Sequence, residues 1–283
     1  MNIQWYPGHM TKAMRNMQGD IKLVDLVIEV VDSRLPISSR NPDIDKLINT
    51  KSRILILNKS DLSDEKLNNQ WKEYFEKSGA AVLLLDSRKT SNSKIVAGEI
   101  DKARKVKSEK DKKRGILNRP LRVMVVGIPN VGKSTLINSL AKKAAAKIGD
   151  KPGVTKGNQW IKLSKGVELL DTPGLLWPKF EDEEVGIKLA LAGSINDNII
   201  DQEELAYKGV SYLCEHYAGA IKSFYNVSED DKPYEILTNI AVSRNLIKSG
   251  SAPDTLRAAK MFLEDLRSAK IERITFEQPK SRN

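Results

Sequence analysis

The residues Gly127-Ile-Pro-Asn-Val-Gly132-Lys133-Ser134 decide the fold of this 283-residue chain. They match the pattern G-x-x-x-x-G-K-[ST], with a short apolar run at 123–126 before them and a helical pattern at 135–140 after them. In such a loop the backbone N–H groups at a helix N-terminus surround phosphate oxygens, the lysine neutralises them and the hydroxyl can bind Mg²⁺. The residues expected to bind a nucleotide here are Gly127, Asn130, Val131, Gly132, Lys133, Ser134 and Thr135.

Alternating apolar runs and helical patterns indicate an α/β domain around this loop. Short β-branched runs separated by helix-period segments are typical of a mostly parallel sheet with crossover helices. The expected strands are residues 26–31, 54–57, 82–85, 123–126, 159–163 and 167–170.

From residue 178 onward the patterns become helical. The expected helices are residues 183–195, 203–217, 234–248 and 254–270, with Gly250 as a helix C-cap and Pro253 at a helix start. We therefore expect two domains, residues 1–177 and an all-helical 178–283, as suits a chain of this length.

The charge of the chain is unevenly distributed. Lys and Arg number 47 against 37 Asp and Glu, a net +10 that favours an acidic partner such as nucleic acid. Residues 101–122 hold ten basic and three acidic residues, net +7, whereas residues 178–283 are net −4. We expect 101–122 to be a basic linker or an exposed helix, either contacting RNA or merely solvated. A second basic contact, or simple amphipathic packing, would account for Arg257, Lys260, Arg267, Lys270 and Arg273.

The composition excludes several classes of protein. A single cysteine, Cys214, cannot form an internal disulfide and argues against a cysteine-based zinc site. No run of about 18 apolar residues exists to span a membrane, and the first residues lack the features of a signal peptide. We expect a cytoplasmic protein.

Two further motifs follow expected strands. Asp171-Thr-Pro-Gly174 ends the strand 167–170, where the acid can hold Mg²⁺ through water and the Gly174 amide can meet a γ-phosphate. Asn58-Lys59-Ser-Asp61 ends the strand 54–57, and the Asp61 carboxylate can accept the N1 and N2 hydrogens of guanine, which adenine does not offer. Together with the phosphate loop, these motifs predict GTP binding.

These residues resemble the G1, G3 and G4 elements of the translation-factor-related GTPases, but in a different order. Here Asn58 precedes Gly127, so the order is G4, G5, G1, G2, G3, as in the circularly permuted GTPases. With Trp5-Tyr-Pro-Gly-His9-Met and the stretch from Asp171 to Lys179, the chain resembles the bacterial ribosome biogenesis GTPase A (YlqF-type) family over nearly its whole length. In this arrangement switch II leads directly into the helical domain.

The resemblance implies further site residues. Thr155 would ligate Mg²⁺ from switch I, and Ser87 occupies the G5 position, although Asp86-Ser-Arg88 departs from the usual S-A-K. His9 is a candidate for catalysis or for a structural or RNA-binding role, with Lys133 and Gly174 as the other catalytic residues. Asn130 resembles the asparagine of potassium-stimulated GTPases, or is an ordinary polar residue of the loop.

The leading functional hypothesis is a cytoplasmic, monomeric GTPase that binds GTP and GDP with Mg²⁺, and with K⁺ if Asn130 serves it. It would assemble the large (50S) ribosomal subunit by binding its precursor and rRNA, without binding DNA or a membrane, and leave after hydrolysis. Leu175 and Leu176 replace a water-orienting glutamine, so hydrolysis should be slow alone and faster with a partner. The alternatives are a regulatory G protein whose acidic helices bind a protein effector without RNA, and a P-loop ATPase, which Asn58 and Asp61 disfavour.

Overall fold

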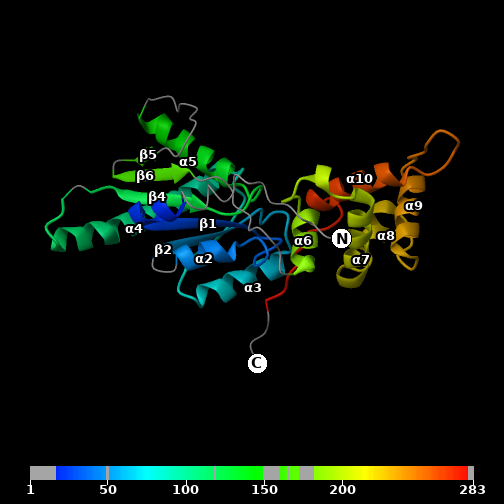
Figure 1. The fold of residues 1–283 in the computed structure, drawn as a ribbon, viewed down its shortest axis with the longest axis horizontal. Coiled ribbons are helices and arrows are strands. Elements are labelled where there is room, and N and C mark those ends of the chain that lie inside the picture. The colour runs from blue at the N-terminus through cyan, green and yellow to red at the C-terminus, as the bar shows by residue number, and fades with distance from the viewer. Residues whose placement is uncertain are drawn as a thin grey trace. The chain divides into compact units, whose positions relative to one another are not determined.

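The protein is represented by a computed structural model, which describes residues 17–48, 51–117, 119–148, 160–164, 166–171 and 182–279 (Figure 1). These residues form two compact units. One, the nucleotide unit, comprises the described residues from 17 to 61 and from 65 to 171, with 277–279. The other, the helical unit, comprises 62–64 and 182–276.

The nucleotide unit is built on one six-stranded sheet in the order β3-β2-β1-β4-β6-β5. Its strands are β1 (Leu26–Asp32), β2 (Ser52–Asn58), β3 (Ala81–Leu85), β4 (Leu121–Val126), β5 (Trp160–Ser164) and β6 (Val167–Asp171). All neighbours pair in parallel except β5, which is antiparallel to β6. The expected mostly parallel α/β sheet is confirmed, and the bounds of each expected strand differ by at most two residues from those of an observed strand.

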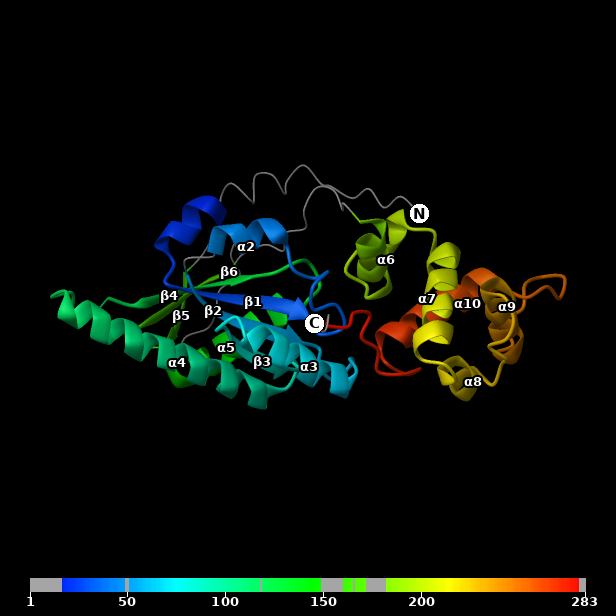
Figure 2. The same ribbon diagram turned by 90° about the horizontal axis from the view of Figure 1, so that it is seen from below.

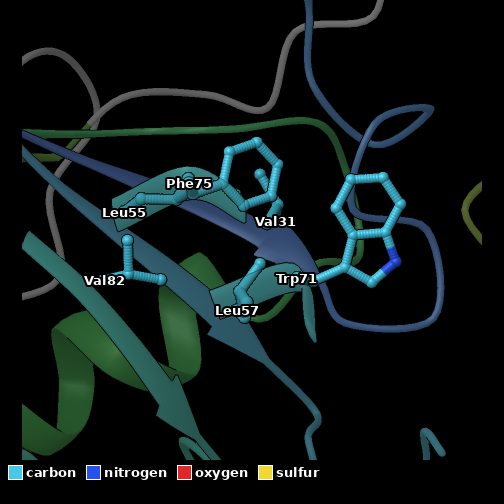
Figure 3. Close-up of a cluster of buried hydrophobic side chains, with 6 residues drawn as sticks. All are labelled: Val31, Leu55, Leu57, Trp71, Phe75 and Val82. Carbon is cyan, nitrogen blue, oxygen red and sulfur yellow. The ribbon is translucent and has the colours of Figure 1, made fainter. Parts of the chain in front are cut away.

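The central strands are buried on both faces, as parallel strands usually are. Val31, Leu55 and Leu57 point to the same face as Val82 and pack there against Trp71 and Phe75 of α3 (Glu65–Glu76) (Figure 3). Alternate residues on the same strands, such as Ile28 and Ile56, face the opposite way and are also fully buried. This double coverage explains why the strands are continuous apolar runs in the sequence.

The basic segment 101–122 is mostly helix, which corrects the expectation of a linker and realises the alternative of an exposed helix. Helix α4 (Thr90–Lys113) takes up residues 101–113 and packs against α5 (Lys133–Ile148), and β4 begins at Leu121. Val96 and Ile100 are buried on the inner side of α4, and ion pairs such as Lys102–Glu99 and Lys105–Asp101 lie along its outer side. The charge pattern alone does not show this inner apolar side.

Helix α4 is longer than the strands beside it. Its 24 residues span about 36 Å, whereas strands of five to seven residues span about 17–23 Å. Because α4 starts near the carboxyl ends of the strands, its last turns project beyond their amino ends, as Figures 1 and 2 show. The basic end of α4 therefore lies at the opposite end of the sheet from the loops that follow β2, β3 and β4.

The helical unit consists of short helices packed around α7 and α10. Its elements are α6 (Glu183–Leu191), α7 (Gln202–His216), α8 (Ala220–Tyr225), α9 (Pro233–Ser243) and α10 (Thr255–Arg267). Phe262 and Leu266 of α10 are buried, and Gly209 of α7 allows close packing because an added Cβ would lie 2.9 Å from the Phe262 ring. An N-cap aspartate begins α7, where Asp201 accepts hydrogen bonds from the backbone of Glu203 and Glu204 at 3.0 Å.

Three expectations for this unit are wrong. The expected helix 234–248 ends at Ser243, because residues 247 and 253 pair as a β-bridge around a turn, and Gly250, with φ 90°, lies in that turn instead of capping a helix. Pro253 does not start α10, whose N-cap is Asp254. The short helix α8 was also missed, since six residues give too little periodicity to detect.

Each unit includes a short segment that adjoins the other unit in the sequence. Residues 62–64 belong to the helical unit, where Ile274 N–H donates to the Leu62 carbonyl at 3.2 Å and Asp64 N–H donates to Thr275 Oγ1 at 3.1 Å. Glu277 belongs to the nucleotide unit, where its carboxylate accepts hydrogen bonds from the backbone of Ile37 and Ser38 at 2.6 and 2.9 Å. In the described part of the chain, every helix is too short or too polar to cross a membrane.

Candidate nucleotide-binding site

Three predicted motifs meet at the carboxyl edge of the sheet. Asn58 ends β2, Ser87 follows β3 and Gly127 follows β4. Because these strands are parallel, their carboxyl ends share one edge, which is where open α/β sheets bind their ligands. The structure thus brings together two motifs that lie 69 residues apart in the sequence, from Asn58 to Gly127.

Asn58 holds the three loops together. Its Nδ2 group donates to the Val131 carbonyl at 2.7 Å and to Ser87 Oγ at 3.1 Å, and its Oδ1 accepts from the Ser87 N–H at 2.9 Å. The Asn58 side chain is buried, so these bonds are shielded from water. In this state the Ser87 N–H is engaged by Asn58, and Ser87 supports the site instead of offering that amide to a base.

The phosphate loop needs its glycines because other atoms approach its backbone closely. At Gly132, with φ 98°, an added Cβ would lie 2.3 Å from Asn58 Nδ2 and 3.2 Å from Ser87 Oγ. At Gly127, with φ 151°, it would lie 2.3 Å from the Val30 carbonyl oxygen of β1. Both glycines therefore combine an unusual backbone conformation with a lack of space.

Lys133 and Ser134 begin helix α5. The Lys133 ammonium is buried and donates to the Ile128 carbonyl at 2.7 Å, which holds the lysine inside the curve of the loop. Ser134 is exposed in the first turn. The first N–H groups of a helix have no intrahelical partner, so this turn offers donors, a positive dipole end and an ammonium group to an anion. Asn130 has a φ of 61°, a left-handed conformation that asparagine tolerates well.

A buried ionic cluster, not predicted from the sequence, lies beside the loop that follows β2. Asp32 ends β1 and is fully buried; its carboxylate accepts from Arg34 Nε and Nη2 at 2.9 and 2.8 Å and from Lys59 Nζ at 2.8 Å. Burial raises the pKa of Asp32, but the charges of Arg34 and Lys59 lower it more, so the pKa lies well below its usual range. The cluster fixes Lys59, whose backbone is left-handed at φ 60°.

Ser33, which follows Asp32 in the loop after β1, also holds the end of β2. Ser33 donates twice to the Asn58 carbonyl, from its N–H at 2.8 Å and from its Oγ at 2.7 Å. The only sequence signal for these residues is a run of charged and small polar residues directly after an apolar strand, which is common at loops. Their importance comes from the pairing of β1 with β2, which sets Asp32 beside Asn58.

Asp61, the residue predicted to recognise guanine, faces Arg88. Asp61 Oδ2 accepts a hydrogen bond from Arg88 Nη2, and Arg88 also donates from Nε to Asp86 Oδ1 at 2.9 Å and from Nη2 to Asp86 Oδ2 at 3.1 Å. These hydrogen bonds hold the pKa of Asp86 below its usual value. Asp61 Oδ1 is buried and has no hydrogen-bond partner among the described residues.

Several predicted site residues lie outside the described residues. They are His9, Thr155 and Gly174, and the side chain of Asp171 is not described either. The backbone of Asp171 ends β6, where it pairs with Val125 of β4, two residues before Gly127. This register places Asp171 next to the phosphate loop. No group of three or more His, Cys, Asp or Glu residues suited to a metal ion occurs in the part of the chain that the structure describes.

Several known proteins are similar to this chain. Residues 122–239 match the family model described as 50S ribosome-binding GTPase. A protein of Bacillus cereus named ribosome biogenesis GTPase A is 44% identical over 99% of this chain and 95% of its own length. The chain belongs to the ribosome biogenesis GTPase A family. The relative of that name from Thermotoga maritima is 34% identical over 98% of this chain and 95% of its own.

Solved structures of this family share the fold. The GDP-bound structure of YlqF matches 94% of this chain and 99% of its own with a TM-score of 0.71 at 29% identity, and the GNP-bound structure from T. maritima gives a TM-score of 0.67 at 30% identity, over 94% of this chain and 98% of its own. The family-model match begins at residue 122 and so leaves β1 to β3, with Asn58, before it. As a member of the ribosome biogenesis GTPase A family, the chain is a GTPase that binds guanine nucleotides, with the circularly permuted order of motifs.

Proposed function

We propose that this GTPase is an assembly factor for the large ribosomal subunit, which binds the precursor particle through rRNA and leaves after GTP hydrolysis. The names of its relatives support the ribosomal role: one is ribosome biogenesis GTPase A, and another, from Mus musculus, is mitochondrial ribosome-associated GTPase 1, at 33% identity over 97% of this chain and 90% of its own. The site supports the nucleotide role. Slow hydrolysis alone and stimulation by the particle belong to the same proposal.

The observation that carries the RNA part is the free basic end of α4. Lys110, Lys112, Lys113 and Arg114 are exposed and make no ion pair with the described residues, whereas Lys107, one turn earlier, pairs with Asp111 at 3.0 Å. Uncompensated cations on a projecting helix suit the phosphates of a nucleic acid, which release counterions when neutralised. These residues lie at the amino ends of the strands and are therefore remote from the nucleotide.

We propose Mg²⁺ as the metal that accompanies the nucleotide. Ser134 lies in the first turn of α5, the helix that follows β4, and Asp171 ends β6, which pairs with β4. Hydroxyl and carboxylate oxygens are the ligands that Mg²⁺ prefers. Thr155 would add a third oxygen. Potassium at Asn130 is a separate proposal, which hydrolysis rates in KCl against NaCl test.

Sedimentation with large subunits and their precursors tests the proposal. We expect the GTPase to co-sediment with a nonhydrolysable GTP analogue more than with GDP, and less as salt rises. Replacing Lys110, Lys113 and Arg114 by Gln should reduce affinity roughly tenfold and lower the salt slope by up to about three. GDP affinity should not change.

A matched variant controls for the loss of charge. Replacing the exposed Lys22, Lys66 and Lys77 by Gln also removes three positive charges, but from other parts of the nucleotide unit. This variant should sediment with the particle nearly as wild type does. Equal losses in both variants would show only a general effect of charge. If the protein never sediments with the particle in any nucleotide state, the effector hypothesis, in which the helical unit binds a protein, replaces the assembly factor.

A further inference from the structure

Arg88 joins two carboxylates beside the predicted guanine site. Its Nη2 group is shared between Asp86 Oδ2, at 3.1 Å, and Asp61 Oδ2, while its Nε holds Asp86 Oδ1 at 2.9 Å. The Arg88 N–H also donates to Asp86 Oδ1, at 3.0 Å. Arg88 thus binds Asp86 through its backbone N–H and through its side chain. The Nη2 group that donates to Asp86 also donates to Asp61.

Asp86 and Asp61 both accept hydrogen bonds from the guanidinium of Arg88. These hydrogen bonds favour the charged form of Asp86, and the Nη2 group of Arg88 orients the carboxylate of Asp61. A planar guanidinium can do this with several donors in a fixed geometry, which an ammonium cannot.

The loop that carries Arg88 is fixed from the other side. Ser87 is held to Asn58 by two hydrogen bonds, Lys89 N–H donates to the Asp86 carbonyl at 3.0 Å, and Asn92 Nδ2 donates to the same carbonyl at 2.9 Å. Although the Arg88 side chain is two-thirds exposed, both of its ends are therefore anchored. An ordinary surface ion pair lacks such anchoring and contributes little.

The oxygen of Asp61 that Arg88 does not hold is Oδ1, which is covered from solvent and has no hydrogen-bond partner among the described residues. Guanine can reach Oδ1 only when the atoms that cover it move aside, and a donor that then binds there satisfies an oxygen whose unpaired burial is costly. Oδ1 can accept one donor of guanine, and Oδ2 can accept a second on its other lone pair while it keeps the bond from Arg88.

We propose that Arg88 is a positioning residue for base selection, which bridges Asp86 and Asp61 and thereby aims the Asp61 carboxylate at the N1–H and N2–H donors of guanine. The inference rests on the proposed role of Asp61 in base recognition. It assigns Arg88 an effect on which base is bound, beyond an effect on affinity.

Equilibrium binding of GDP and IDP to the full chain tests this inference. IDP lacks the N2 amino group, so the ratio of the two affinities reports how well Asp61 is aimed. Arg88→Met should weaken GDP binding about tenfold, weaken IDP binding less and so reduce the ratio. Arg88→Lys should restore part of the ratio, because one ammonium can reach one carboxylate but not bridge both.

Two further variants make the outcome decisive. Lys89→Met removes one positive charge at the next residue, which is exposed, and should leave the ratio near wild type. In an Asp61→Asn background Arg88→Met should change GDP binding by less than about twofold, because the group through which it acts is gone. Unfolding midpoints in urea identify any variant that has lost its fold.

The possible failures are distinguishable. An unchanged GDP to IDP ratio in Arg88→Met overturns the inference, as does an equal loss for both nucleotides that persists in the Asp61→Asn background. If Asp61→Asn itself leaves the ratio unchanged, the assignment of Asp61 to the base is wrong, and the proposed site fails with it.

Discussion

Charged side chains at one end of the mostly parallel sheet are paired with one another, whereas cations at the other end are exposed and unpaired among the described residues. At the carboxyl edge, Asp32, Arg34 and Lys59 are paired with one another, and the carboxylate of Asp32 is completely buried. At the amino edge, the cations Lys113 and Arg114 stand in solvent without ion-pair partners among the described residues. The first arrangement fixes a site before the ligand arrives, whereas the second leaves charge available to an external partner.

The difference suits the ligand that we propose for each end. A nucleotide is small, so the residues that recognise it must be held in place by a shell of hydrogen bonds, such as those from Asn58 to Ser87 and Val131. A polyanion such as RNA is large and is attracted by charge over several ångströms, so exposed and flexible cations suffice. Substitutions at the two ends should therefore differ in size and in their dependence on salt.

The largest difference is expected for carboxylates. Asp32→Asn leaves the buried Arg34 and the partly buried Lys59 without their anion, which should reduce the free energy of unfolding by about 3–5 kcal/mol. Asp101→Asn, on the exposed side of α4, removes pairs to Arg104 and Lys105 and should leave the free energy of unfolding close to that of wild type. Urea denaturation of both variants measures the comparison, and similar losses would contradict it.

Glycines offer the next comparison. Gly132→Ala forces a Cβ against Asn58 Nδ2 and should weaken GDP binding about a hundredfold, or about 2.7 kcal/mol. Gly98→Ala, in the exposed middle of α4 with no atom within 4 Å, should instead raise stability by about 0.5–1 kcal/mol without altering GDP binding. Isothermal titration and thermal unfolding of both variants separate the two effects. Loss of GDP binding in Gly98→Ala would show that α4 affects the site.

Much of the fold could be predicted because its strands and the phosphate loop can each be recognised from a short stretch of sequence. Strands such as β1 and β2 are continuous apolar runs, and the phosphate loop has a fixed spacing that leads directly into α5. The helix boundary at Ser243 could not be predicted in this way, because the turn after it depends on the bridge between residues 247 and 253.

The candidate site also has residues that the sequence predicts and residues that it does not. Asn58, Asp61 and Lys133 could be predicted as site residues because each belongs to a short motif with a known chemical purpose. Asp32 was missed because its importance comes from a neighbouring strand and from complete burial of a charge, neither of which is visible along the chain. Arg88 was passed over since its partner Asp61 lies 27 residues away.

Acid should expose the smallest difference, that between the buried cluster and the outer side of α4. The folded-state pKa of Asp32 lies below its unfolded value, so its contribution is fully present above about pH 4 and is lost as pH falls further, by about 1.4 kcal/mol per pH unit. Asp101 of α4 also has a lowered pKa, through hydrogen bonds from Arg104 and Lys105, but its side chain is partly exposed to solvent. Salt should therefore screen its effect and leave that of Asp32.

The measurement is the difference in unfolding free energy between wild type and each aspartate variant, from pH 6 to pH 2, in low and high salt. For Asp32→Asn the difference should shrink as pH falls below about 4 and should be nearly independent of salt. For Asp101→Asn any difference should already vanish in about 0.5 M NaCl at pH 6. A salt-sensitive effect at Asp32 would mean that water reaches its carboxylate, and that the carboxyl edge of the sheet is less preformed than its hydrogen bonds indicate.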